Sequence, residues 1–187
     1  MDRKKLLDFL AQEVDNKNII KHMLATEVCM GALADKLGAE DKDDWMMAGL
    51  MHDGDYKDSV PAEKQGIEVT NTLRSQGIEV PQTVAQAMAA HNWSHNRVEP
   101  KSLMDWALFC CDSLTGLIVA ATLVLPSRKL ADVTVGRVLN RFKEKSFAKG
   151  TRRDEIAMCQ EKLNIPLEEF IGICLKAMQS ISNDLGL

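Results

Sequence analysis

The stretch from Lys101 to Leu125 constrains the fold most, because it is apolar on nearly every side. Its large apolar side chains include Leu103, Trp106, Leu108, Phe109, Leu114, Leu117, Ile118, Val119, Leu123 and Val124. A helix that is apolar all round is stable in water only when other parts of the chain cover it. Pro126 ends this helix, because proline lacks the backbone N–H that would continue it. We therefore expect a buried central helix with other helices packed around it.

The segments on either side repeat apolar residues at helical spacing and show no alternation typical of a strand. Expected helices cover Asp2–Val14, Asn16–Leu37, Asp43–His52, Pro61 to about Gln76, Pro81–His91, Thr134 to about Lys145, Thr151 to about Leu163 and Pro166 to about Leu185. All five prolines fall at segment boundaries. The sequence thus predicts an all-α fold, a bundle of about eight to nine helices.

The chain of 187 residues fits one domain and can bury a core. We expect a single domain over residues 1–187, with its core at about 16–126 and a C-terminal helical extension at about 127–187. The longest apolar run, Leu114–Leu125, is shorter than the ~20 residues that a membrane span needs. The N-terminus lacks the continuous apolar region of a secretory signal. A cytoplasmic protein without membrane contacts is the resulting expectation.

The net charge bears on the possible partners, and the cysteine spacing bears on the redox state of the chain. The net charge of -4 gives no reason to expect a nucleic-acid polymer as a partner. Basic residues cluster between Arg137 and Arg153 among apolar ones, which fits either a solvated helix face or a local anion site. The five cysteines show no CxxC spacing and lie in apolar runs, so we expect reduced cysteines in the core.

An imidazole and a carboxylate stand side by side where one expected helix ends. The chain from Trp45 to Asp55 reads WMMAGLMHDGD, so His52 and Asp53 close an apolar helix and Gly54 follows. Glycine adopts the left-handed conformation that closes helices at little cost. A metal ion lying between the directions of the two side chains could therefore bind both. An isolated pair of this kind also fits a histidine with a purely structural role. The other polar residues of the chain must therefore distinguish that role from metal binding.

Three of those residues stand at apolar positions. Asp112 lies in the middle of the most apolar helix, where an unpaired carboxylate would cost several kcal/mol. It needs a metal ion, a lysine or arginine, or a hydrogen bond to a residue such as Ser113. His22 lies on a small apolar stripe and His91 at the end of an expected helix, where each is either a core histidine or a ligand. We expect His95 to face solvent.

Together these residues make a set of metal ligands. The three imidazoles and two carboxylates are His22, His52, Asp53, His91 and Asp112. Mixed nitrogen and oxygen ligands suit a divalent Mn, Fe, Co, Ni or Zn ion, and the sequence does not choose among them. Calcium prefers oxygen ligands, and structural zinc sites use thiolates.

The order His22, then His52 with Asp53, then Asp112, on successive helices, resembles the HD superfamily of metal-dependent phosphohydrolases. The strings KHMLATEVCMGALADKLG, WMMAGLMHDGDY, DSLTGLIVAATLVLPSRKLADV and FKEKSFAKG look like a small bacterial and archaeal branch of predicted HD hydrolases. This resemblance covers almost the whole chain, from about Leu6 to Leu187. It implies an HD-domain helical bundle, a metal site and hydrolysis of a phosphoester, such as a nucleotide or another small phosphorylated metabolite.

Two departures from the family pattern bear on the metal. The usual motif reads HDI with a further acidic residue, whereas this chain reads HDGD from His52 to Asp55. Relatives with a second metal tend to have a histidine before the glycine where this chain has Gln65 and Gly66, and an amide is a poor replacement for imidazole. We therefore expect one metal ion. Its ligands would be His22, His52, Asp53 and Asp112, with His91 either a fifth ligand or a substrate contact.

The expected reaction is metal-assisted hydrolysis, in which the ion polarises a phosphoryl oxygen and activates water. Asp53 would hold the ion, and Asp55 would help to position the water. Lys57, Arg128 and Lys129 are candidate phosphate contacts, although solvent-facing charges explain them equally well.

Two other classes of function stay open at this point. Some HD-fold proteins hold two irons and activate oxygen, which requires more histidines than this chain supplies with confidence around Gln65. A non-catalytic module that binds a metal or a nucleotide is the other class. The helices after His91 exceed what the ligand set requires, so they could form a lid or the interface of a homodimer.

Overall fold

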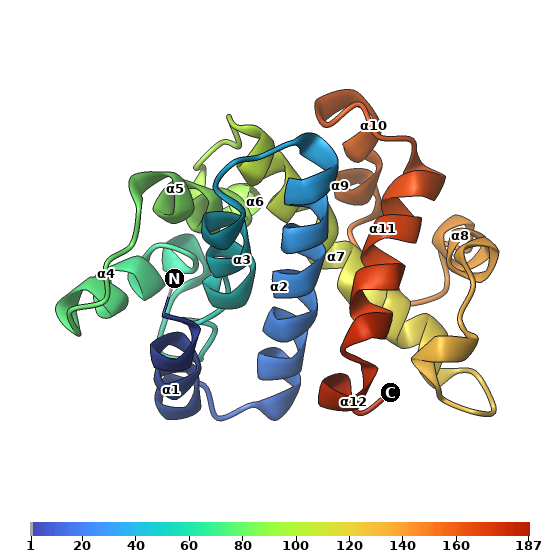
Figure 1. Cartoon of the computed structure of the whole chain (residues 1–187), viewed down its shortest axis with the longest axis horizontal. Coiled ribbons are helices and arrows are strands. Elements are labelled where there is room, and N and C mark those ends of the chain that lie inside the picture. The colour runs from blue at the N-terminus through green and yellow to red at the C-terminus, as the bar shows by residue number, and fades with distance from the viewer. Residues whose placement is uncertain (1) are drawn as a thin grey trace.

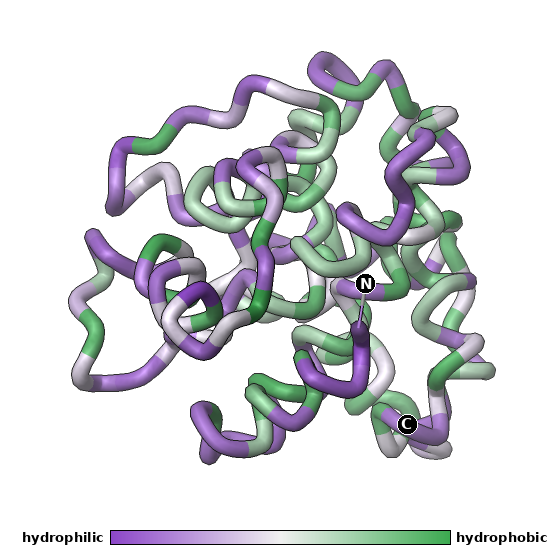
Figure 2. The backbone as a smooth tube through the Cα atoms, turned by 60° about the vertical axis from the view of Figure 1, so that its left-hand side comes forward, coloured by the Kyte–Doolittle hydropathy of each residue, from purple (hydrophilic) through white to green (hydrophobic). Residues whose placement is uncertain are grey.

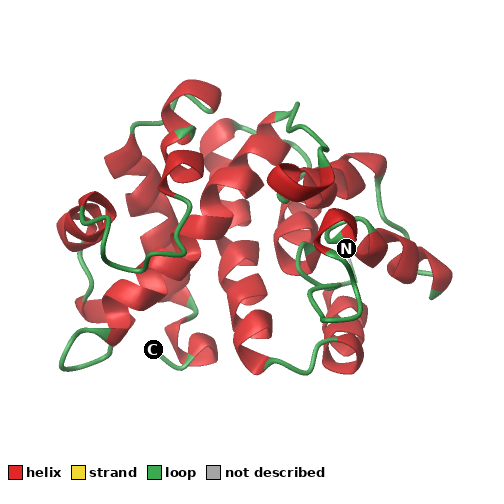
Figure 3. Cartoon of the chain, turned by 180° about the vertical axis from the view of Figure 1, so that it is seen from behind, coloured by secondary structure: helices red, strands yellow, loops and turns green. Residues whose placement is uncertain are grey.

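The computed structural model describes residues 2–187, and all regular elements in that range are helical (Figures 1 and 3). The all-α prediction is confirmed. The α-helices are α1 (Arg3–Glu13), α2 (Lys17–Leu37), α3 (Lys42–Met51), α4 (Glu68–Ser75), α5 (Gln82–Ala90), α6 (Trp93–Asn96), α7 (Leu103–Leu123), α8 (Val135–Lys143), α9 (Arg153–Ala157), α10 (Cys159–Lys162), α11 (Leu167–Ser180) and α12 (Ser182–Leu185), and the 3-10 helices are η1 (Ala62–Lys64) and η2 (Leu130–Asp132).

The helix count exceeds the predicted eight to nine because several elements are single turns. Helices α6, α10 and α12 have four residues each, and α9 and α10 divide the helix expected at 151–163. The helix expected at 61–76 is also divided, because Gly66 has a φ of 79° and separates η1 from α4. A residue at positive φ cannot continue a right-handed helix.

The apolar stretch forms α7, which lies at the centre as predicted and packs against α2, α3, α5, α8, α9, α10 and α11. Ser102 and Asp105 cap its N-terminus through reciprocal hydrogen bonds. By length and composition its 21 residues are enough to cross a membrane. However, 72% of its most apolar window is buried inside the protein, as in the core helix of a soluble protein. The apolar segments gather inside the bundle, and hydrophilic ones lie mainly at its edges (Figure 2).

A very close approach of α3 to α2 places His52 next to His22. A Cβ atom on Gly49 would lie only 2.8 Å from the carbonyl oxygen of Thr26, so glycine is required where the two helices meet. His52 follows Gly49 by almost one turn, and His22 precedes Thr26 by one turn. The contact therefore brings both imidazoles to the same end of the helix pair.

The C-terminal helices complete the same core. α11 packs against α2, α7 and α8, and its Phe170, Ile171 and Cys174 are fully buried. All five cysteines are buried and unpaired, as the sequence predicts. The loop between α8 and α9 lies on the same side of α7 as the histidines, so it faces them across a cleft.

Candidate metal centre

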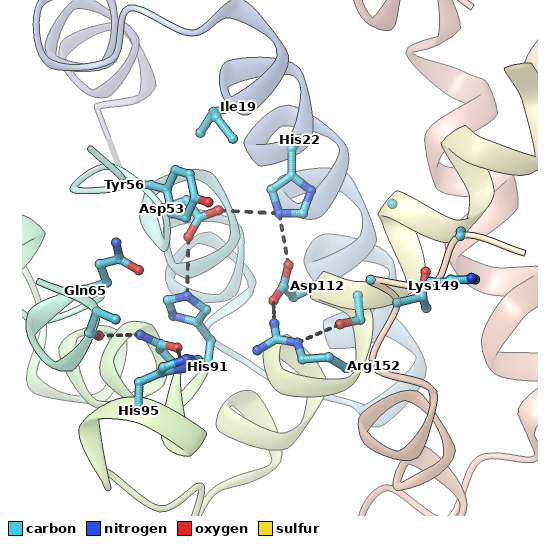
Figure 4. Close-up of a pocket in the computed structure, with 17 residues that line it drawn as sticks. Ile19, His22, Asp53, Tyr56, Gln65, His91, His95, Asp112, Lys149 and Arg152 are labelled. Carbon is cyan, nitrogen blue, oxygen red and sulfur yellow. Dashed lines mark hydrogen bonds and ion pairs between the residues drawn. The ribbon is translucent and has the colours of Figure 1, made fainter. Parts of the chain in front are cut away.

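Four helices bring the predicted ligands together. His22 comes from α2, His52 and Asp53 follow α3, His91 follows α5, and Asp112 lies on α7 (Figure 4). His52 is fully buried, whereas the side chains of His22, Asp53 and Asp112 keep exposed fractions of 22%, 15% and 11%. The cluster therefore lies at the inner end of an opening rather than in a sealed core.

The imidazoles of His22 and His52 form the centre of this cluster. Their Nε2 atoms lie 3.2 Å apart. Oδ1 of Asp112 lies 3.0 Å from Nε2 of His22 and 3.8 Å from Nε2 of His52. Oδ2 of Asp53 lies 3.7 Å and 3.6 Å from the same two nitrogens. A single ligand atom from each of His22, His52 and Asp53 fits within a group that spans no more than 4.8 Å.

The hydrogen bonds behind the imidazoles fix which nitrogen faces the cluster. Nδ1 of His52 donates to the carbonyl of Gly49 at 2.9 Å, because a carbonyl oxygen can only accept. Nδ1 of His91 donates in the same way to the carbonyl of Met88. In the neutral form of both side chains, the lone pair is therefore on Nε2, which points into the cluster.

His22 reaches the same tautomer through a side chain. The hydroxyl of Thr115 donates its single proton to the carbonyl of Asp112 at 2.8 Å, so it accepts a hydrogen bond from Nδ1 of His22 at 2.9 Å. Metal-binding histidines are commonly oriented by a second hydrogen bond of this kind. Thr115 is not among the residues predicted from the sequence. The one feature that could have indicated it is its position about one helical turn after Asp112.

Each carboxylate has one oxygen in the cluster and the other held from outside. Oδ1 of Asp53 lies 3.4 Å from Nε2 of His91, while its Oδ2 faces His22 and His52. Oδ2 of Asp112 accepts a hydrogen bond from Arg152 at 2.6 Å, while its Oδ1 faces the same two histidines. One oxygen of each carboxylate thus lies within 3.8 Å of Nε2 of both His22 and His52.

These groups fit a divalent ion. Bonds of about 2.0 to 2.2 Å to a common ion hold neighbouring ligand atoms about 3 to 3.6 Å apart. The two Nε2 atoms lie 3.2 Å apart, Oδ1 of Asp112 lies 3.0 and 3.8 Å from them, and Oδ2 of Asp53 lies 3.7 and 3.6 Å from them. The converging atoms are all acceptors once the imidazoles are neutral, so a cation is what would satisfy them.

The electrostatics of the cluster favour negative carboxylates beside positive charge. Burial would raise the pKa of Asp53, but the charges of His52 and His91 outweigh it and lower that pKa to about 2. Burial is outweighed in the same way at Asp112, where the nearby imidazoles of His22 and His52 hold the pKa well below its usual range. At His91, burial opposes the charged form, and the contact with Asp53 more than compensates, so its pKa is raised.

The cluster opens into a cleft of about 760 Å³. His22, Asp53, His91 and Asp112 lie on one wall, and the opposite wall is formed by residues 148–152. Arg152 and Lys149 are the basic side chains that this second wall contributes. His95, which is exposed as expected, lies at the edge of the same cleft.

Arg152 is the main residue that sequence reasoning missed. Its guanidinium donates to Oδ2 of Asp112 at 2.6 Å and to Oγ of Ser113 at 3.1 Å (Figure 4). An ion pair with an arginine is one of the alternatives for Asp112, and it occurs, whereas the hydroxyl of Ser113 pairs with Arg152 and not with Asp112. The other oxygen of Asp112 faces the histidines. The one signal in the sequence was the basic stretch from Arg137 to Arg153.

Arg153 holds the loop that carries Arg152. Its guanidinium donates to backbone carbonyl oxygens of Arg141, Phe142, Glu144, Phe147, Ala148 and Thr151. Ala148 has a φ of 43°, which is unfavourable for a residue with a Cβ atom. One side chain therefore replaces the regular hydrogen bonds that this irregular segment lacks.

The side chain of Asp55, predicted to position the attacking water, is bound to backbone groups outside the cleft. Its side chain is buried, and its two oxygens accept hydrogen bonds from the backbone N–H of Gly66 and Val69 at 2.8 to 3.0 Å. These bonds hold the turn before α4 against the end of α5, where a Cβ on Gly66 would lie 3.0 Å from His91. Asp55 thus supports the position of His91 and does not line the cleft.

The predicted phosphate contacts do not line the cleft either. Nζ of Lys57 pairs with Glu13 at 2.9 Å. Arg128 and Lys129 are exposed after the end of α7, outside the residues that line the opening. Gln65 does line it, and its amide donates to the carbonyl of Val60 at 3.4 Å.

Comparisons with protein-family models, with curated proteins and with solved structures find no match to this chain. The side chains of the cluster are therefore the basis for inferring a function. The firmest element of this basis is the group of His22, His52 and Asp53, which could hold a metal ion.

Proposed function

We propose that this chain is a metal-dependent phosphohydrolase of the HD type, with one divalent ion bound by His22, His52, Asp53 and Asp112. One observation carries the proposal. Nε2 of His22 and Nε2 of His52 lie 3.2 Å apart and 3.0 to 3.8 Å from one oxygen each of Asp53 and Asp112. Each Nδ1 proton is committed elsewhere, so in the neutral form of the imidazoles both Nε2 atoms are acceptors. Such a set of acceptors needs a cation, and mixed nitrogen and oxygen ligands suit first-row metals.

In this proposal some side chains bind the metal ion and others hold those ligands in position. When bound, a divalent ion polarises a phosphoryl oxygen and lowers the pKa of water at the site. Asp53 and Asp112 each offer one oxygen to the ion, because the protonated form of His91 and the guanidinium of Arg152 hold the other oxygen of each. His91 is therefore a positioning residue for Asp53 in this proposal rather than a fifth ligand.

The substrate would enter from the cleft. Its volume of about 760 Å³ admits a small phosphorylated metabolite, and the partly exposed His22 and Asp53 lie on its wall. Arg152 supplies positive charge on the opposite wall, in place of Lys57, Arg128 and Lys129. Guanidinium groups bind phosphate oxygens through paired hydrogen bonds, so Arg152 is the stronger candidate for a phosphate contact.

The test is elemental analysis of protein purified without chelators or a metal-affinity tag, followed by a screen of phosphoesters. We expect about one Mn, Fe, Co, Ni or Zn ion per chain. We also expect phosphate release that stops when the metal is removed and resumes when it is restored. Two irons per chain with oxygen consumption would favour the oxidative class. Metal without turnover on a broad panel, but with saturable nucleotide binding, would favour a non-catalytic module.

A further inference from the structure

A second, smaller hollow lies on the other side of His22. Its volume is about 540 Å³, and it is enclosed by α2, α7 and the last residues of the chain. Figure 3 shows the C-terminus between the ends of these two helices. The walls are mainly apolar and include Ala25, Val119, Leu123, Leu185 and Leu187, while Asn18 and Lys21 add polar groups.

This apolar hollow shares part of its wall with the metal-site cleft. His22 and Gly116 line both spaces. Gly116 follows Asp112 by four residues on α7, so the two positions lie one above the other on the same face of the helix. The hollow therefore begins within one helical turn of a proposed metal ligand.

The glycine at this position has no explanation in packing. Glycine is among the poorest residues for the interior of a helix, and Gly116 is in the middle of α7. A Cβ atom there would meet no atom within 4 Å, in contrast to Gly49, where the backbone of α2 leaves no room for one. A side chain at position 116 would instead project into the space between the cleft and the hollow.

We propose that the apolar hollow binds the aliphatic part of the substrate, which passes over Gly116 while the phosphate group lies at the metal. This inference rests on the proposed function and narrows its substrate class to phosphoesters that carry an aliphatic group. The apolar walls match such a group, because burial of each methylene group in an apolar site strengthens binding. The shared wall explains why the two hollows adjoin and why position 116 has no side chain.

The test is binding of methyl-, butyl- and hexylphosphonate to the manganese-loaded full chain, measured by titration calorimetry. Phosphonates have a carbon in place of the ester oxygen, so they report binding without turnover. In the wild-type protein we expect affinity to increase about fourfold for each methylene group that enters the hollow. In Gly116→Leu the new side chain fills the passage, so the ratio of the hexyl to the methyl affinity should fall to near one.

Gly136→Leu is the matched control. Gly136 lies in the first turn of α8, where a Cβ also meets no atom within 4 Å, but it lines neither hollow. This variant should keep the wild-type ratio. Equal affinities across the series in the wild-type protein, or an unchanged ratio in Gly116→Leu, would overturn the inference alone. No binding of any phosphonate by protein that holds manganese would count against the proposed function as well.

Discussion

The two walls of the metal-site cleft are built in different ways. On the helical wall, His22 and Asp112 lie on α2 and α7, and Asp53 directly follows the end of α3, so the packing of these helices fixes their positions. On the loop wall, residues 148–152 form no regular structure, and the guanidinium of Arg153 holds their surroundings through backbone carbonyls. Packing of many side chains thus fixes one wall, and hydrogen bonds from a single side chain fix the other. Arg152 joins the two walls through Asp112.

The largest effect should come from removing a ligand on the helical wall. In Asp53→Ala, Oδ2 is lost from the metal cluster and His91 loses its partner. We expect the metal content to fall from about one ion per chain to near zero, and activity to fall to background. Elemental analysis and a phosphate-release assay measure both. Asp58→Ala, in the exposed loop that follows, should behave as wild type. Full activity of Asp53→Ala would refute the site assignment.

A smaller effect should follow when the link between the walls is cut. In Arg152→Gln, Oδ2 of Asp112 loses its charged partner, so the carboxylate is free to rotate. Replacing partners of metal ligands typically lowers metal affinity or activity about 10- to 100-fold, and we expect a change in this range. Competition with a chelator measures the affinity. Arg128→Gln removes an exposed arginine outside the cleft and should change nothing. Equal behaviour of the two variants would show that the walls are independent.

The orientation of His22 offers a test within the helical wall alone. Thr115→Val removes the hydroxyl that accepts from Nδ1 of His22, and we expect about tenfold weaker metal binding, at the low end of such effects. Thr122→Val is the matched control, because Thr122 is equally buried in α7 and also donates to a backbone carbonyl. Metal affinities that change alike in both variants would mean that the hydroxyl of Thr115 has no specific role.

The helical wall could largely be predicted from the sequence, because its signals are local. His52 and Asp53 stand at a helix end before a glycine, and Asp112 interrupts an apolar helix. In both cases the cost of burying a polar group predicts that it has a partner. The resemblance to the HD superfamily added the order of the ligands, which local patterns do not give.

The loop wall could not be predicted, because its contacts depend on how distant segments meet. Arg152 is 40 residues from Asp112 in the chain, and nothing local distinguishes it from its basic neighbours. Lys57 is a predicted phosphate contact because it follows His52 and Asp53 closely in the sequence. Its ammonium group pairs instead with Glu13, 44 residues away. Asp55 was assigned to catalysis for the same reason, although its partners are backbone groups of a later turn. Proximity in sequence was a poor guide wherever a loop was involved.

The loop wall should open locally when its support is removed. In Arg153→Leu, six backbone carbonyls lose a hydrogen-bond donor, and the positive φ of Ala148 is no longer enforced. We expect faster hydrogen exchange in residues 144–152 and a decrease in activity of a few fold, with metal content unchanged. Mass spectrometry of exchanged peptides measures the first. Loss of metal at the same time would show that the helical wall depends on the loop.

The smallest effect concerns how two carboxylates respond to pH: Asp53 on the helical wall, and Glu155, which contacts Arg152 from α9 behind the loop wall. Burial raises the pKa of Glu155 from its ordinary value of 4.5 to about 7, although Arg152 opposes the change. The Nε atom of Arg152 lies 2.9 Å from Oε2 of Glu155 but donates its hydrogen bond to Ser113. The pKa of Asp53 on the helical wall moves in the opposite direction, to about 2.

The sign of the pH effect follows from proton binding. Between pH 4.5 and 7 the folded protein retains the proton on Glu155 that the unfolded chain releases, so this residue lowers the free energy of unfolding as pH rises. Glu155→Gln cannot titrate. Its stability relative to wild type should therefore increase from pH 5 to pH 7, as measured by chemical denaturation at both values. Asp53 contributes no pH dependence in this window, because its pKa of about 2 in the folded protein and its ordinary value of 3.8 both lie below it. A constant difference between Glu155→Gln and wild type would mean that Glu155 is solvated and that the loop wall is more open than its contacts indicate.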